Sequence, residues 1–365
     1  MLSLLLVACG SSKKKNEETS DSSSFSKDGP ASAATATATQ PQDEGDLILV
    51  SRVGDSFSPS FSDNNQEVIF LSGDRPTHRR VEAYTFNLKE KKERRLTFSS
   101  GSVSSAVAWK TNYYFISDTE ALKESPSIFR EDSGKSTPLN DLFELNDEKD
   151  ELLRLSNSSD YYRNLRIGKT TLFWSQGHEA AQVMMKKDDG ALPISFLPKS
   201  PDISATVDRT GGWWAWVQRI QTDKLEIKIR SPSGETQKIA IDQLQNQRVQ
   251  DLHFEWWNLE GQPILLILKP DMNLNYSLWS YLPNEKCEKN LSLQSGKGPI
   301  QALVPSSKGD QFLLVTGMAP NRSISLSKSE VAGQLRQQLV DSPECGVPMI
   351  KTPLASILKE PLEKD

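Results

Sequence analysis

Short apolar runs alternate with polar turns over most of the chain, and the clearest example occupies residues 58–97. The apolar run 68–71 follows the turn-forming cluster 62–65, whose short polar side chains can bond to turn backbones. A continuous apolar run of this length indicates a strand buried on both faces, because a half-exposed strand alternates apolar and polar residues. A charged loop, an apolar segment at 81–86, a turn and a start of a strand at 95–97 complete the unit. Four strands joined in this order are the wiring of a propeller blade.

Fainter copies of the unit fill the chain as far as residue 329, each with an apolar or aromatic anchor, a polar turn and an apolar run. The anchors are spaced roughly 40 to 60 residues apart, near the 40–50 residues typical of propeller blades. They are Phe61, Trp109, Ile167, Thr206, Trp257 and Val304. Second hairpins are expected in the later copies at 127–130, 182–185, 226–229, 277–280 and 323–326. Six anchors predict six blades.

Three segments fall outside this rhythm. Residues 47–53, LILVSRV, form a lone strand before the first full unit, and we expect it to complete the last blade so that no sheet edge stays unpaired. The acidic segment 141–155 is interpreted as a short helix or an inserted loop between the second and third blades. Residues 330–365 begin with a strand or helix and end in a Pro-punctuated strap that closes or covers the last blade. The propeller is therefore assigned to residues 47–329.

The N-terminus is apolar from residue 1 to residue 8 and ends in Leu6-Val7-Ala8-Cys9, which resembles the lipobox of bacterial lipoproteins. The resemblance implies cleavage before Cys9 and a lipid on its thiol. No basic residue precedes Leu2, so the true start lies upstream or the chain is truncated. Eight apolar residues are too few to span a membrane. Residues 9–46 are low in complexity and are expected to act as a disordered tether.

The first unit resembles the TolB-like propeller repeat through Phe61-Ser62-Asp63, Val68-Ile69-Phe70, Glu82-Ala83-Tyr84 and Arg94-Arg95-Leu96-Thr97. The resemblance implies an all-β, six-bladed propeller of four-stranded blades, with partners among envelope proteins such as a peptidoglycan-associated lipoprotein. That particular partner is not carried over, because the chain lacks the additional N-terminal α/β domain of TolB. A glycine after Cys9 resembles lipoproteins sorted to an outer membrane, on the periplasmic side or at the cell surface.

Cysteine usage fits an exported protein, since the chain has only three cysteines. If Cys9 carries a lipid, Cys287 and Cys345 remain, and a pair outside the cytoplasm is most simply a disulfide. It would tie the fifth blade to the C-terminal segment; two separate buried thiols are the alternative. The net charge of −5 and the lack of a dense basic patch argue against nucleic-acid binding.

Candidate chemistry is sparse. The three histidines, His78, His178 and His253, lack metal-ligand spacing, and no CxxC or GxSxG motif occurs. Asp63, Asp208 and Asp310 lie at blade turns, where capping explains them, with Ca²⁺ binding as the alternative. The sequence therefore predicts a protein without cofactor, metal site or catalytic residues.

Tryptophans concentrate in the fourth and fifth blades, at Trp213, Trp214, Trp216, Trp256 and Trp257. They form either a core between blades or an aromatic platform for a sugar or peptide. Together with the loop residues His78, Arg79, Arg80 and His178, they are the candidate binding residues. The predicted function is a monomeric, lipid-anchored, non-catalytic scaffold that binds envelope proteins. The alternative is a propeller that binds carbohydrate or degrades polysaccharide.

Overall fold

The computed structural model describes residues 43–44, 47–98, 101–119, 140–156, 160–168, 171–177, 180–187, 190–200, 203–221, 224–242, 252–270, 276–293, 299–341 and 345. All of them fall in one compact unit, Thr39–Asp365. Among these residues, no helix combines the length and the apolar content needed to cross a membrane.

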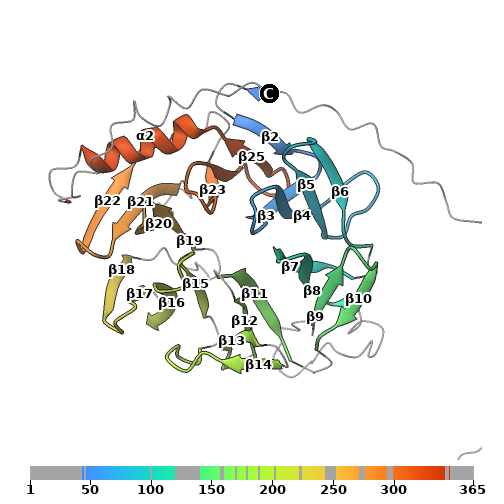
Figure 1. Cartoon of the computed structure of the whole chain (residues 1–365), viewed down its shortest axis with the longest axis horizontal. Helices are drawn as coiled ribbons and strands as arrows, with labels where there is room; N and C mark the ends of the chain where they lie inside the picture. Colours follow the sequence, from blue (N-terminus) through green and yellow to red (C-terminus); the bar gives the residue numbers. More distant parts are fainter. Residues whose placement is uncertain are drawn as a thin grey trace, which may run out of the picture. The chain divides into compact units, whose positions relative to one another are not determined.

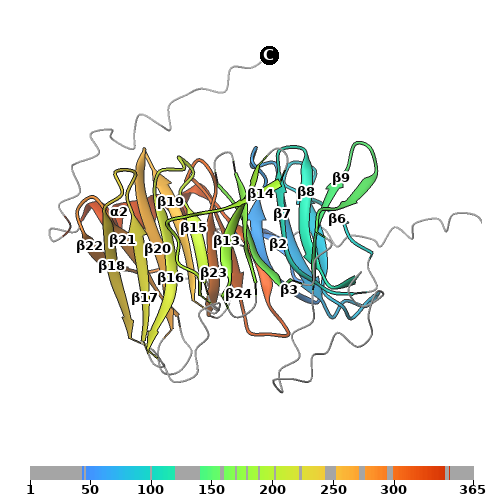
Figure 2. The same cartoon turned by 90° about the horizontal axis from the view of Figure 1, so that it is seen from below.

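Six antiparallel sheets are arranged as blades around a central channel (Figure 1), and their strands run between the two faces of the propeller (Figure 2). In each blade the first strand lies innermost. The first three blades are β3 (Asp55–Phe61), β4 (Glu67–Gly73), β5 (Glu82–Asn87), β6 (Lys92–Arg95); β7 (Val103–Trp109), β8 (Asn112–Ser117), β9 (Asp141–Asn146), β10 (Glu151–Arg154); and β11 (Tyr162–Ile167), β12 (Leu172–Gln176), β13 (Gln182–Lys187), β14 (Gly190–Pro193). The fourth and fifth are β15 (Ser204–Val207), β16 (Trp214–Gln221), β17 (Lys224–Arg230), β18 (Thr236–Asp242); and β19 (His253–Leu259), β20 (Gln262–Pro270), β21 (Tyr276–Leu282), β22 (Cys287–Leu291). The prediction of an all-β, six-bladed propeller of four-stranded blades is confirmed.

The sixth blade combines the two ends of the propeller. Its strands are β23 (Ile300–Pro305), β24 (Phe312–Thr316), β25 (Ser323–Ser327), β2 (Leu47–Ser51) and β1 (Asp43–Glu44). β2 pairs antiparallel with β25, so a strand from the start of the chain completes the blade formed by its end. This pairing removes the free edge that β25 would otherwise present.

The core lies between neighbouring blades, which explains the continuous apolar run in β4. Val68 and Phe70 pack with Leu313 and Val315 of the sixth blade. Ile69 and Leu71 point the other way and pack against the second blade. Because successive side chains of a strand point to opposite faces, a strand packed between two blades needs apolar residues at every position.

A polar network closes the outer hairpin of the first blade. The Glu82 carboxylate binds Arg95 (3.0 Å) and the Thr97 hydroxyl, and that hydroxyl in turn accepts the Ala83 N–H (3.0 Å). Glu82 is only 1% exposed, so its charge depends on these partners. The network therefore gives a physical reason for the charged and hydroxyl residues that end the unit.

The second blade repeats this network and corrects the interpretation of segment 141–155. Asp141 binds Arg154 (2.8 Å) and the Ser156 hydroxyl (2.8 Å), which accepts the Leu142 N–H (2.9 Å). The segment is therefore neither a helix nor an inserted loop; it forms β9 and β10, the outer hairpin of the second blade. The hairpin expected at 127–130 lies outside the described residues.

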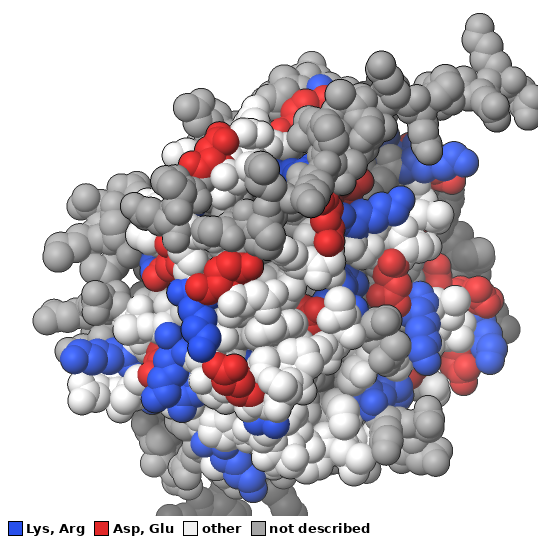
Figure 3. All heavy atoms as spheres, turned by 60° about the vertical axis from the view of Figure 1, so that its left-hand side comes forward, with Lys and Arg blue, Asp and Glu red and all other residues white. Residues whose placement is uncertain are grey.

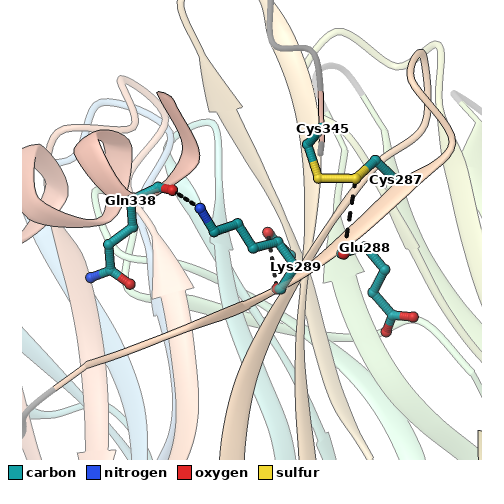
Figure 4. The surroundings of a disulfide bond; sticks show 6 residues. Cys287, Glu288, Lys289, Gln338 and Cys345 are labelled. Atoms are coloured by element: carbon teal, nitrogen blue, oxygen red, sulfur yellow. Dashed lines mark hydrogen bonds between the residues drawn. A yellow bond between two sulfur atoms is a disulfide. The ribbon is translucent and has the colours of Figure 1, made fainter. Parts of the chain in front are cut away.

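After the last blade, the chain forms helix α2 (Ser329–Val340), which settles the strand-or-helix alternative. The helix buries Val331, Leu335 and Leu339 in the core shared by the fifth and sixth blades. Gln338 covers the outer edge at the end of β22 by bonding both the N–H (2.7 Å) and the carbonyl (2.8 Å) of Ser292. Cys287 and Cys345 form a disulfide that joins β22 to the chain beyond α2 (Figure 4). Of the C-terminal segment predicted at 330–365, the part after residue 341 lies outside the described residues except for Cys345.

Candidate functional site

A cavity with a volume of about 650 Å³ occupies the central channel. All six innermost strands, β3, β7, β11, β15, β19 and β23, contribute to its wall. A channel built this way carries side chains from residues that are far apart in sequence, so its chemistry is set by how the blades meet.

Four of the innermost strands contain a β-bulge where they face the channel. The pairing register shifts by one residue between Phe57 and Ser60 in β3, and equivalent shifts occur in β7, β11 and β23. Polar residues at the bulges line the cavity: Ser58, Ser104, Asn164 and Gln301. Ser58 and Asn164 adopt positive φ angles of 49° and 53°. Bulges redirect side chains out of the regular alternation, and here they turn polar groups toward the channel.

Inside the channel, an ion pair connects blades that are not neighbours. Arg166 on β11 binds the Glu255 carboxylate on β19, and the Thr206 hydroxyl on β15 donates to the same carboxylate (3.2 Å). The third, fourth and fifth blades are thus joined by one polar network. Both charges are balanced and hydrogen-bonded, which is the condition for burying them without a large penalty.

Arg209 and Asp63 lie at the channel end where the innermost strands turn into the second strands. Arg209 is in the β15–β16 turn of the fourth blade, and Asp63 is in the β3–β4 turn of the first blade. The first and fourth blades face each other across the channel (Figure 1), and 3.9 Å separates Arg209 Nη1 from Asp63 Oδ1. Burial lowers the pKa of Arg209, although the charges of Asp63 and Glu255 oppose the shift. This end of the channel is therefore narrowed by a poorly solvated guanidinium.

At the opposite end, Arg322 binds Asp55. Arg322 Nε and Nη2 donate to the two carboxylate oxygens at 2.8 and 2.5 Å, and the Arg322 N–H donates at 3.1 Å. The guanidinium also lies over the Phe57 ring, 4.0 Å from its centroid. Burial by itself would raise the pKa of Asp55, but the bonds from Arg322 outweigh it and lower the pKa. The pair fastens the sixth blade to the first.

His253 lies in the channel wall but is bonded to the backbone. Its Nε2 lies 3.1 Å from the Leu303 nitrogen and 2.9 Å from the Leu303 oxygen. Burial lowers the pKa of His253, which favours the neutral ring at pH 7. A neutral ring held against backbone serves to join the fifth and sixth blades.

Of the two histidines among the candidate binding residues, the structure describes only His78. His78 lies in the β4–β5 loop, where it contacts the Arg80 carbonyl (2.7 Å) and the Tyr84 hydroxyl, and Arg79 and Arg80 are exposed beside it. His178 and Cys9 lie outside the described residues. Neither His78 nor its neighbouring arginines line the channel cavity.

The five candidate tryptophans are buried or half-buried. Trp216, Trp256 and Trp257 are 4%, 6% and 0% exposed, because strands of adjacent blades cover both faces of the sheet. Trp257 packs on Phe312, and the half-buried Trp213 packs on Trp256 with 6.3 Å between ring centroids. The half-buried Trp214 contacts Phe173 and Phe196. The cluster is therefore core between blades, with Trp256 also lining the channel.

The turn aspartates act as caps in the described residues. Asp208 accepts the N–H groups of Thr210 (3.1 Å) and Trp213 (2.7 Å), and Asp310 accepts the Ser306 hydroxyl (2.8 Å). Asp63 accepts the Lys110 N–H (2.9 Å) of the next blade. In the part of the chain that the structure describes, no three His, Cys, Asp or Glu side chains gather as metal ligands would.

Four charged residues of the channel were not among the predicted candidate residues: Arg166, Arg209, Glu255 and Arg322. Glu255 is flanked by Phe254 and Trp256, and Arg166 by Leu165 and Ile167. A charged residue between apolar neighbours in an innermost strand must face the channel or be paired. This signal could have identified Glu255 and Arg166.

Outside the channel, lysine, arginine and acidic side chains are interspersed on the face shown in Figure 3. Lys286 of the β21–β22 turn pairs with Glu235 of the β17–β18 turn (3.0 Å), and Lys238 on β18 pairs with Glu226 on β17 (3.7 Å). Mixed charge of this kind adds solubility and little stability. Exposed apolar side chains concentrate instead on the edge strand β10, where Leu152 and Leu153 are 57% and 45% exposed.

No protein-family model matches the chain, and no curated protein matches it in sequence. Solved structures do match. They include an oligogalacturonate lyase from Vibrio parahaemolyticus (13% identity, TM-score 0.48, 77% of this chain and 82% of that one) and TolB from Acinetobacter baumannii (12%, 0.45, 66% and 55%). A sialidase from Trypanosoma rangeli is 13% identical with a TM-score of 0.50, covering 82% of this chain and 59% of the sialidase. At such identities the likeness concerns the fold alone: the chain is a β-propeller with both enzymes and TolB among its structural neighbours.

Proposed function

We propose that the protein is a non-catalytic binding protein of the cell envelope, whose propeller holds a segment of another envelope protein in its channel. The supporting observation is a polar cavity of about 650 Å³ lined by all six blades. At the β-bulges, its wall presents polar side chains that can form hydrogen bonds to a peptide.

The pairing of the titratable groups in the channel supports a binding function over a catalytic one. Glu255 is ion-paired with Arg166, and His253 is held by the Leu303 backbone. A general base must reach the proton that it removes, and both groups are already occupied by the protein itself.

Two features support the proposed location in the cell envelope: the lipobox-like motif Leu6–Cys9 and the disulfide. Disulfides persist mainly outside the cytoplasm, and the Cys287–Cys345 bond lies on the same domain as the channel. A lipid on Cys9 would tether the propeller to a membrane through residues 9–46.

The test is a crosslinked pull-down from extracted membranes with four proteins. The wild type is compared with Cys9→Ser, which removes the lipid site, and with Ser104→Trp, which places a ring in the channel. Ser104 is exposed to the channel and lines the cavity, so the larger side chain fills space without displacing core. Lys89→Trp, on the exposed β5–β6 turn, is the matched control.

One envelope protein recovered with the wild type and Lys89→Trp, and lost with Ser104→Trp, is the expected result. Loss with Cys9→Ser would add support for the tether. Equal recovery with Ser104→Trp would refute binding in the channel, and no recovery with any variant would refute the scaffold.

A further inference from the structure

Arg209 is held in place by a rigid turn. Asp208 caps this turn through the N–H groups of Thr210 and Trp213, and Gly211 adopts a φ of 79° that favours glycine. Arg209 lines the channel cavity, and its side chain is only 26% exposed. The guanidinium is therefore presented to the channel by the fold and is largely withdrawn from water.

The guanidinium is not satisfied by the protein. Among the described residues the one carboxylate in ion-pair contact with Arg209 is Asp63 at 3.9 Å, beyond hydrogen-bond distance, while the Glu255 charge acts on the guanidinium from farther away; Arg209 makes no hydrogen bond to any of these residues. Asp63 already accepts the Lys110 N–H. A charge that is largely withdrawn from water and has no hydrogen bond from the protein carries a desolvation cost, and an anion placed against it would offset part of that cost.

The other arginines of the cavity differ from Arg209. Arg166 is paired with Glu255, and Arg322 is paired with Asp55. Two further donors of the cavity wall are buried without a hydrogen-bond partner, Trp256 Nε1 and Ser60 Oγ. Among the described residues that line the cavity, one cation, Arg209, and two buried neutral donors thus lack a hydrogen-bond partner.

We propose that the channel contains an anion site in which Arg209 binds a carboxylate or phosphate group of the ligand. A guanidinium offers a planar fork of N–H donors that matches both groups. The inference rests on the proposed channel function and specifies it: the segment held there carries an anionic group. Asp63 competes with the ligand for Arg209, since both are negative.

The test measures tryptophan fluorescence of the folded protein at low ionic strength during titration with acetate, with inorganic phosphate and with triglutamate. Trp213 and Trp256 lie in or beside the channel wall and act as reporters. The variants are Arg209→Gln, Arg209→Lys, Asp63→Asn and the control Arg52→Gln, which changes an exposed arginine outside the cavity. Thermal unfolding of each variant checks that the propeller is intact.

We expect saturable binding of at least one probe, weakened about tenfold or more by Arg209→Gln, partly restored by Arg209→Lys and unchanged by Arg52→Gln. Asp63→Asn should strengthen binding, a gain that loss of structure would not produce. Binding of phosphate alone identifies a phosphate site, and binding of acetate and triglutamate identifies a carboxylate site.

The proposal is overturned if no probe saturates the wild type, or if Arg209→Gln binds as the wild type does. Its failure is separable from that of the proposed function. A partner recovered in the pull-down without any anion binding would leave the scaffold standing and remove the anion site.

Discussion

Replacing Asp55 with asparagine tests how the first and last blades are fastened together. Asp55 begins β3 and receives three hydrogen bonds from Arg322, two from the guanidinium and one from the backbone N–H. The Asp55 side chain is 11% exposed and that of Arg322 is 22% exposed. The pair is thus mostly withdrawn from water and only weakly screened by salt.

The expected loss follows from these bonds. A hydrogen bond to a charged group contributes about 1.5–3 kcal/mol net, and asparagine keeps one acceptor oxygen. We therefore expect Asp55→Asn to lower the free energy of unfolding by about 2 kcal/mol at pH 7. For a domain of this size, that corresponds to a fall of roughly 3–5 °C in Tm.

The pH dependence has a defined sign. The folded-state pKa of Asp55 lies below its ordinary value of 3.8, because the Arg322 bonds outweigh the effect of burial. The contribution is therefore fully present above that ordinary value and is lost as the pH falls through the folded-state pKa. The stability difference between wild type and Asp55→Asn should shrink in acid.

Urea unfolding from about pH 7 to about pH 2.5 measures this difference. Glu148→Gln, which changes an exposed carboxylate in the β9–β10 turn, is the matched control and should leave stability unchanged. If Asp55→Asn equals this control at pH 7, or if its deficit is as large in acid as at neutral pH, the reasoning is wrong.

Three further predictions concern the core, the repeat and the disulfide. Trp257→Ala should cost about 3–5 kcal/mol in urea unfolding, because the ring is fully buried against Phe312 and bonded to the Gly309 carbonyl; a loss under 1 kcal/mol would contradict its place in the core. Glu82→Gln and Asp141→Asn should destabilise by similar amounts, roughly 2–3 kcal/mol each, since they hold equivalent networks; a large effect at only one of them would show that the two hairpins are not equivalent. Cys345→Ser opens a loop closed across 58 residues and should cost at most about 4 kcal/mol, with faster amide exchange confined to α2 and β22; faster exchange throughout the first three blades would argue that the disulfide supports the whole ring.

The local pattern of apolar and polar residues predicted the architecture of the blades. The run 68–71 predicted a strand buried on both faces, and Ile69 and Phe70 are indeed packed against different blades. The LILVSRV segment lacked a partner within its own unit, and β2 pairs with β25. These features follow from apolar periodicity and from the need to pair every edge, both of which are written in the linear sequence.

For the outer hairpin of the second blade, the local sequence pattern gave a wrong prediction. Residues 141–156 repeat the three network positions of the first blade at the same spacing, with Asp141 for Glu82, Arg154 for Arg95 and Ser156 for Thr97. Their acidic composition favoured a helix or loop, although the ends of both hairpins are fixed by the same buried network. Tertiary pairing with β8 decided the structure over local propensity.

The sequence by itself determined the blades, their order and the cysteines available for pairing, because these depend on neighbours along the chain. Only the tertiary structure decided which side chains face the channel and which pack between blades. Phe254 and Glu255 are adjacent in sequence, yet Phe254 is core between blades and Glu255 binds Arg166 of a blade two places away. Alternation along a strand sorts its side chains onto two faces but does not tell which face lies toward the channel. The bulges in the inner strands also shift that alternation. The contact between Arg209 and Asp63 exists because closing the ring brings the first and fourth blades opposite each other, a distance that no local pattern encodes.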